Sequence, residues 1–137
     1  MKKSITLLLL FLTLFLSNCS DDNKDDFFLT KENLSQTVWE GAYEVYQNQE
    51  YLYKSDVNLF FKSDKNLEFI VTHEEDETRH TVPYTLKDNL LTIETNSMSP
   101  QLSGDWLIQE QSKNKIVCIK NFGSKTYYYV MTLSRTY

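Results

Sequence analysis

The sequence contains little glycine, proline, cysteine or histidine, and these shortages exclude several kinds of site. Only 3 glycines, 2 prolines, 2 cysteines and 2 histidines occur among 137 residues. The chain therefore has no glycine-rich phosphate-binding loop, and it also lacks an HExxH motif and a nucleophile elbow. The paired carboxylates at residues 74–77 lie in a hydrophilic turn, which does not suit acid–base catalysis. We therefore expect a protein that is not an enzyme and that uses no cofactor or metal.

The sequence also lacks an apolar run long enough to cross a membrane and stay there. Lys2 and Lys3 precede an uncharged run of 12 residues over positions 5–16. A membrane-spanning helix needs roughly 20 apolar residues. A positive start followed by a short apolar run is typical of a secretory signal peptide. We therefore predict a signal peptide over residues 1–18.

The end of this apolar run resembles a known processing site. Leu16-Ser17-Asn18-Cys19 offers no A-x-A pattern for ordinary cleavage, and it resembles the lipobox of bacterial lipoproteins. Asn18 stands where those proteins usually have glycine, alanine or serine. The resemblance implies that Cys19 is lipidated and becomes the mature N-terminus, with acyl chains that hold the protein on a membrane. The alternative is a secreted protein with an incidental cysteine.

An acidic, polar segment follows the cysteine and cannot build a core. We predict that residues 19–29 are the lipidated cysteine and an extended tether. An acidic run directly after a lipidated cysteine also resembles the surface-export signal of some Gram-negative lipoproteins, whereas a plain spacer is the alternative. The expected location is the cell envelope, as an outer-membrane lipoprotein. The cell surface and the inner leaflet both remain open.

The mature chain of 119 residues would carry 12 basic and 19 acidic side chains, a net charge of −7. This acidic balance argues against nucleic acid as a partner and against close contact with anionic lipid head groups. With Cys19 lipidated, Cys118 would be the only free thiol. Its apolar neighbours predict a small buried strand residue and not a nucleophile. The length suits one domain, over residues 30–137.

Strand signals dominate the remainder of the chain. One short helix is expected around residues 31–36, with Thr30 as its N-cap. Alternating β-branched and aromatic runs predict eight strands, at residues 37–46, 51–62, 66–74, 79–87, 90–95, 104–111, 115–121 and 125–135. Short connections favour an all-β, eight-stranded up-and-down antiparallel barrel, because closure removes the exposed edges of an open meander. A two-sheet β-sandwich is the alternative.

The connections differ between the two ends of this predicted barrel. Tight polar turns join alternate strand pairs and so gather at one end, at residues 63–66, 88–89 and 112–114. Pairing across residues 88–89 sets Leu86 opposite Leu91 and Tyr84 opposite Ile93, which keeps large apolar groups on one face. The longer connections share the other end, as in a cup.

The order of these motifs resembles that of bacterial lipocalin-like lipoproteins. The matching segments are Val38-Trp39-Glu40-Gly41 and residues 58–64, 84–93, 103–108 and 131–135. In lipocalins a tryptophan of the first strand, in a Gly-x-Trp motif, closes the barrel under an arginine from the last strand. The resemblance implies this closing role for Trp39 and Arg135, whose positions at the tight end would allow a cation–π stack. Thr37 stands where the glycine would be.

Two histidines flank the acidic turn. The predicted strands place His73 directly opposite His80 on the interior face, with Glu74 opposite Arg79 on the outside. Two imidazoles at the mouth of a barrel suit a divalent metal or a response to pH. Because the spacing supplies no third ligand, we favour a polar hairpin rim and predict no metal site.

The inward-facing aromatic residues suggest a ligand site. Rings below and hydroxyls near the mouth suit a small amphipathic molecule, although the same rings could fill the interior completely. The candidate ligand-binding residues are Tyr43, Tyr53, His73, His80, Trp106 and Tyr129. We therefore expect an anchored barrel that binds a small apolar or amphipathic ligand. The alternative is a protein-interaction module, such as an accessory subunit or an inhibitor, with a filled barrel.

Overall fold

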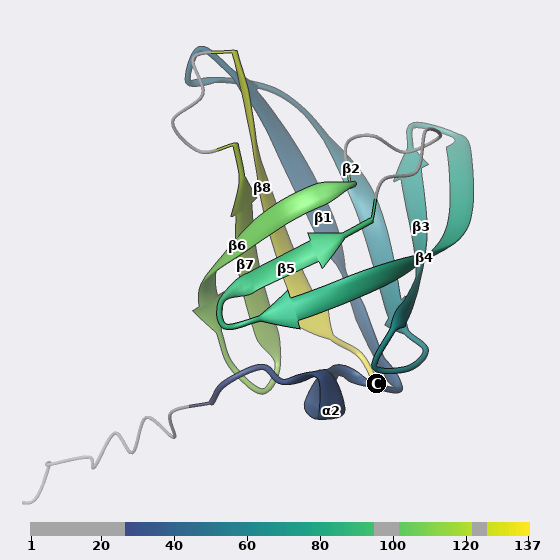
Figure 1. Ribbon diagram of the computed structural model, residues 1–137. Coiled ribbons are helices and arrows are strands. Elements are labelled where there is room, and N and C mark those ends of the chain that lie inside the picture. Colours follow the sequence, from purple (N-terminus) through teal and green to yellow (C-terminus); the bar gives the residue numbers. More distant parts are fainter. Residues whose placement is uncertain (1–26, 95–101, 122–125) are drawn as a thin grey trace, which may run out of the picture.

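Eight antiparallel strands close into one barrel in the computed structural model (Figure 1). The structure describes residues 27–94, 102–121 and 126–137. The predicted signal peptide, Cys19 and the tether through Asp26 lie outside the described residues. Within the described part of the chain, no helix has the length and apolar character that crossing a membrane requires.

Each strand pairs with the next one in the sequence, and the last strand pairs with the first. The strands are β1 Thr37–Gln47, β2 Glu50–Phe61, β3 Asn66–His73, β4 Asp76–Lys87, β5 Leu90–Ile93, β6 Gly104–Gln111, β7 Lys115–Lys120 and β8 Tyr127–Arg135. The predicted up-and-down barrel is therefore confirmed, and the β-sandwich is excluded. Burial alternates along most strands, because successive side chains point to opposite faces.

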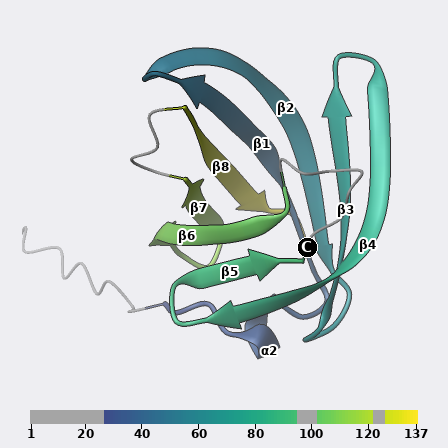
Figure 2. The same cartoon turned by 45° about the horizontal axis from the view of Figure 1, so that its top comes forward.

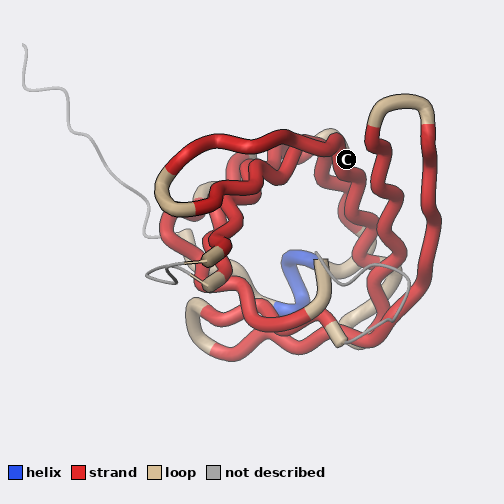
Figure 3. The backbone as a smooth tube through the Cα atoms, turned by 90° about the horizontal axis from the view of Figure 1, so that it is seen from above, coloured by secondary structure: helices blue, strands red, loops and turns tan. Residues whose placement is uncertain are grey.

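The two ends of the barrel differ as predicted. The end that carries the β2–β3, β4–β5 and β6–β7 turns, here called the turn end, also holds the helix α2 (Lys31–Leu34) and the C-terminus (Figure 1). The opposite end, here called the loop end, carries the other connections. The β3–β4 hairpin stands away from the remaining strands at the loop end (Figures 2 and 3). Its β4 strand pairs with β5 only from Tyr84 to Lys87.

Helix α2 forms where the sequence predicts it. Thr30 caps the helix: its hydroxyl accepts from the Asn33 backbone N–H at 3.2 Å, and its own N–H donates to Asn33 Oδ1 at 2.8 Å. Just before the helix, Leu29 is buried, and its N–H donates to Gln111 Oε1 at 2.9 Å. The packed domain therefore begins before residue 30, and the end of the predicted tether belongs to it.

The closing pair of strands depends on one glycine. A Cβ atom at Gly41 of β1 would lie 1.9 Å from the backbone oxygen of Thr132 in β8. That separation is far below a van der Waals contact, so β1 and β8 approach as closely as they do because residue 41 has no side chain.

The predicted pairing of β4 with β5 is confirmed, whereas the predicted pairing of β3 with β4 is wrong. Leu86 lies opposite Leu91 and Tyr84 opposite Ile93, as predicted. His73, however, lies opposite Asp76, and His80 lies opposite Phe69. The hairpin turns at residues 74–75, and β4 begins earlier than predicted. The difference is four residues, and a slip by an even number leaves every side chain on the same face, so the apolar pattern could not detect it.

Candidate functional site at the loop end of the barrel

Three tyrosines converge inside the barrel at the loop end. Tyr43 of β1 lies opposite Ser55 of β2. Two residues further along β1, Val45 is flanked by Tyr53 of β2 and by Tyr129 of β8. Tyr43 is only 3% exposed and Ser55 only 2%. Burial raises the pKa of Tyr43, and the neighbouring Tyr53 and Tyr129 raise it further. The Tyr43 hydroxyl therefore keeps its proton at neutral pH and remains a hydrogen-bond donor.

A histidine extends this polar group to the rim. His73 Nδ1 lies 2.9 Å from Ser55 Oγ, a hydrogen bond whose direction depends on the histidine tautomer. The Tyr53 ring meets the His73 ring edge to face, with centroids 5.1 Å apart. Since His73 is exposed whereas Ser55 is buried, the pair connects the solvent-facing rim with the interior.

A lysine occupies the other side of the same interior. Lys120, at the end of β7, places its Nζ 4.8 Å from the Trp106 ring centroid and 4.5 Å from that of Tyr129. Its ammonium donates to the Ser103 carbonyl at 3.0 Å. Lys120 is only 6% exposed, and burial lowers its pKa to about 8. The two ring faces stabilise a charge that the barrel otherwise takes out of water.

We call this set of side chains the mouth cluster: Tyr43, Tyr53, Ser55, His73, Lys120 and Tyr129. Its six residues come from five strands, β1, β2, β3, β7 and β8. It combines aromatic faces, hydroxyl donors and one cation.

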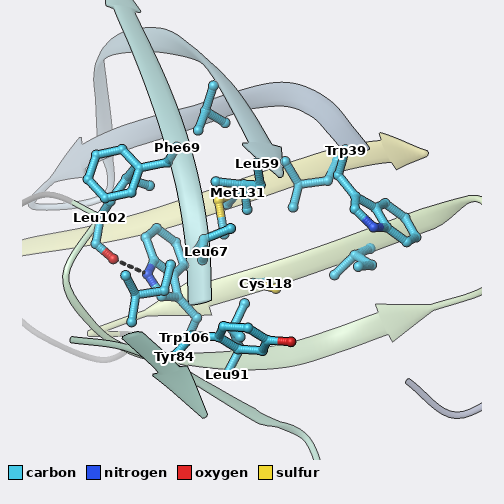
Figure 4. Packing of buried hydrophobic residues seen from close by; sticks show 14 of the residues in the cluster. Trp39, Leu59, Leu67, Phe69, Tyr84, Leu91, Leu102, Trp106, Cys118 and Met131 are labelled. Atoms are coloured by element: carbon cyan, nitrogen blue, oxygen red, sulfur yellow. Dashed lines mark hydrogen bonds between the residues drawn. The ribbon is translucent and has the colours of Figure 1, made fainter. Parts of the chain in front are cut away.

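Large apolar side chains from several strands pack together inside the barrel (Figure 4). The Trp106 indole forms the floor of the mouth cluster and donates to the Leu102 carbonyl at 2.7 Å. The core residues with no exposed surface are Leu59, Phe61, Leu67, Phe69, Ile93, Leu102, Trp106, Cys118, Met131 and Leu133. These ten side chains belong to one hydrophobic cluster inside the barrel.

Most of the predicted ligand residues come together, but one does not. Tyr43, Tyr53, His73 and Tyr129 belong to the mouth cluster, and Trp106 lies beneath it. His80 instead packs its ring at 5.6 Å from Phe69, on another row of the barrel. That row is about 13 Å along β3 from His73, at ~3.3 Å per residue.

The observed β3–β4 register also changes the expected partner of Arg79. Arg79 lies opposite Ile70 and contacts Glu68 at 3.5 Å, so its predicted pairing with Glu74 is wrong. Among the described residues no three histidine, cysteine, aspartate or glutamate side chains lie together as metal ligands would. The hairpin instead presents acidic side chains to solvent.

Trp39 and Arg135 lie opposite one another across the β1–β8 closure. The Trp39 indole is buried and donates to Thr37 Oγ1 at 2.8 Å. The Arg135 side chain is exposed, and its Nε donates to the Tyr137 carbonyl at 3.2 Å. The Thr37 hydroxyl is therefore the acceptor for the tryptophan N–H.

Two further surface features lie outside the mouth cluster. A groove of about 610 Å³ at the turn end is lined by Phe28, Leu29, Thr30, Lys31, Glu32, Leu86, Asp88 and Asn89. On the outer wall, Tyr46 stacks on Tyr128 with centroids 4.7 Å apart and meets Tyr51 edge to face at 5.9 Å. These exterior tyrosines form an aromatic surface near the loop end.

Comparison with known proteins assigns no family. No protein-family model matches the chain, and no curated protein matches it in sequence. The functional argument therefore depends on the geometry of the site.

Proposed function

We propose that this protein is a membrane-anchored lipoprotein whose barrel binds a small amphipathic molecule at the loop end. The observation that carries the proposal is the convergence of tyrosine hydroxyls and a lysine inside an otherwise apolar barrel. Burying polar and charged groups is costly, so a wall built only for stability would use apolar side chains here. A few polar groups among aromatic walls are typical of ligand sites.

The proposed ligand is small, because large buried side chains such as Trp106 and Phe69 occupy part of the barrel interior. Its apolar part would contact the rings of Tyr53 and Tyr129, which are both partly exposed. Its polar part would meet the hydroxyls and the Lys120 ammonium. The protein performs no catalysis in this proposal.

The anchor is proposed from the sequence: a short leader, the Leu16-Ser17-Asn18-Cys19 segment and an acidic spacer. Diacylation or triacylation of Cys19 would hold the protein on the outer membrane, because two or more acyl chains bind firmly. The turn end receives the chain from that spacer, so the mouth cluster lies at the opposite end of the barrel.

The second candidate is a protein-interaction module. Two observations favour it: the extensive buried apolar core, and the exterior tyrosines, of which Tyr51 is 53% exposed. Tyrosine is enriched at protein–protein interfaces because it supplies a large, rigid contact surface. In this case the barrel is a scaffold, and the outer wall makes the contacts.

One experiment separates the two candidates. The full chain is purified from its own cell envelope, extracted with organic solvent and analysed by mass spectrometry. We expect one small molecule in stoichiometric amount, lost in Tyr53→Ala and retained in Tyr51→Ala, because the two tyrosines lie on the same strand but face the interior and the outer wall respectively. A barrel that is reproducibly empty contradicts ligand binding and directs the next experiment to crosslinking on intact cells.

A further inference from the structure

One side of the β3–β4 hairpin is a strand edge that no strand covers in the described part of the chain. β4 pairs with β3 from Asp76 to Pro83, but it pairs with β5 only from Tyr84 to Lys87. Over the first of these ranges the hairpin stands away from the remaining strands (Figures 2 and 3). An exposed strand edge is a template for pairing with a further strand.

The backbone groups that this edge presents follow from the hydrogen bond at its lower end. The Pro83 carbonyl accepts from the Glu94 N–H, directly after β5, at 3.0 Å. Backbone groups of successive residues point to opposite sides of a strand, so the odd-numbered residues of β4 face the β5 side. Along the uncovered edge these residues are Glu77, Arg79 and Thr81, and all three are exposed.

The charges along this edge complement a second copy of the same strand. Two antiparallel copies centred on Thr78 place Glu77 of each copy opposite Arg79 of the other, and the same register sets Asp76 opposite His80. A shift of the centre by one residue would set Glu77 against Glu77, or Arg79 against Arg79. Opposite charges directly across two strands stabilise the pairing by roughly 0.2–1 kcal/mol each, and like charges oppose it. The order of charges therefore favours one register.

Neither charge has to leave a strong partner to pair in this way. The Arg79 side chain is 59% exposed and lies 3.5 Å from Glu68, which also pairs with Lys62. No basic side chain of the described residues forms an ion pair with Glu77. Arg79 can therefore turn to a second copy without leaving Glu68 unpaired.

We propose that the β4 edge is a self-pairing surface, on which two copies of this chain join their β3–β4 hairpins antiparallel with Thr78 at the two-fold axis. Backbone hydrogen bonds between Glu77 of one copy and Arg79 of the other would continue the sheet across both hairpins. This inference does not depend on the ligand proposed for the mouth cluster.

The symmetry of such a pair decides where it can form. The two-fold axis is perpendicular to the joined sheet, so the turn ends of the two barrels point in opposite directions. Two copies with their turn ends on one bilayer cannot pair in this way, whereas copies on two facing bilayers can. The test therefore uses the full chain in detergent solution, where the barrels turn freely.

Disulfide formation at the centre of the pair tests the register. Thr78→Cys would place two thiols in a non-hydrogen-bonded pair with Cα atoms ~4.5 Å apart, a separation that a disulfide spans. Thr81→Cys is the matched control, because the two copies of that residue would lie roughly 20 Å apart. On mild oxidation we expect Thr78→Cys to form a covalent dimer at least about fivefold faster than Thr81→Cys. The native chain is the blank, and its Cys118 is buried.

Charge variants that also carry Thr78→Cys separate a specific pair from chance collision. Glu77→Lys or Arg79→Glu alone would set like charges opposite one another and should slow dimer formation at least about fourfold. The double variant Glu77→Lys/Arg79→Glu exchanges the charges and should return the rate to within about twofold of the parent. A mixture of the two single variants should likewise crosslink, which also shows that their hairpins are folded.

Two results would overturn the self-pairing surface. One is an equal rate for Thr78→Cys and Thr81→Cys, which is also expected if the edge takes a strand from a different protein. The other is a mixture of the single variants that crosslinks no faster than each variant alone. Neither result bears on the ligand, which the extraction from the cell envelope tests separately.

Discussion

Lys120 is held inside the barrel by contacts that offset only part of its loss of water. The ring faces of Trp106 and Tyr129 and the Ser103 carbonyl all favour the ammonium form. The pKa is nevertheless lowered to about 8, which means that burial outweighs these contacts. The folded protein therefore carries a strained charge at neutral pH, and this strain makes stability depend on pH.

The sign of this dependence follows from proton counting. In an unfolded chain a lysine has a pKa of ~10.4, so Lys120 keeps its proton between about pH 8 and pH 10. In the folded barrel most of that proton is lost over the same range, because the pKa of Lys120 is about 8. Because the unfolded state then binds more protons, stability rises with pH across this window. We expect the free energy of unfolding of the native chain to increase between pH 7.5 and 9.5 by up to about 2 kcal/mol relative to Lys120→Met.

Urea unfolding at several pH values measures this difference. The window must stop below about pH 10, because tyrosines with a raised pKa in the folded state, such as Tyr43 and Tyr84, reverse the slope above it. Lys54→Met should follow the native curve, since its side chain is exposed. Parallel curves for the native chain and Lys120→Met would show that the ammonium is not strained.

Neither Ser55 nor Lys120 is among the site residues predicted from the sequence, although the period of two places both on the interior face. Ile116, Cys118 and Lys120 occupy alternate positions of one strand, and the first two are buried. A lysine at the end of such a series faces the interior, yet it resembles an ordinary solvated strand end. Its neighbours Trp106 and Tyr129 come from other strands, so their contact with Lys120 depends on pairing that the sequence does not state.

At the scale of the elements, the strands were predictable because burial on one face imposes alternation, and tight turns mark the boundaries. The β4–β5 register followed from a two-residue turn that leaves one good alignment. The β3–β4 hairpin differs because its acidic sequence over residues 74–78 accepts turns of several lengths. Alternatives that differ by even numbers of residues bury the same side chains, so hydrophobic pattern cannot choose between them.

The observed hairpin has a specific backbone signature. Glu74 adopts a positive φ of 55°, a region that costs residues with a side chain about 1–2 kcal/mol relative to glycine. Glu74→Gly should therefore stabilise the barrel by roughly 0.5–1 kcal/mol, after the larger entropy of the unfolded glycine chain is subtracted. Thr78→Gly, inside β4, should destabilise it by about as much. Thermal unfolding of both variants tests the hairpin, because a turn at residues 75–78 would reverse the two effects.

At the scale of the whole molecule, the barrel has a closed end and a polar end. Helix α2, Trp39 and the tight turns close the turn end, whereas the mouth cluster occupies the interior of the loop end. The chain enters at the turn end (Figure 1). A lipid anchor at Cys19 would therefore place the closed end toward the bilayer and the mouth cluster away from it. Such an orientation leaves the proposed ligand site open to the aqueous side.

Energy transfer to the membrane measures this orientation. Residues 20–26 can extend over at most about 25 Å, and β1 with 11 residues rises by roughly 36 Å before tilt. A dye on Lys113→Cys, at the turn end, should therefore transfer more energy to an acceptor lipid than a dye on Asn48→Cys, at the loop end. Cys118 is buried and should not take up the dye. Cys19→Ala should abolish transfer from both positions because the protein leaves the membrane. Greater transfer from residue 48 would place the mouth cluster against the bilayer, and its ligand would then have to enter from the lipid.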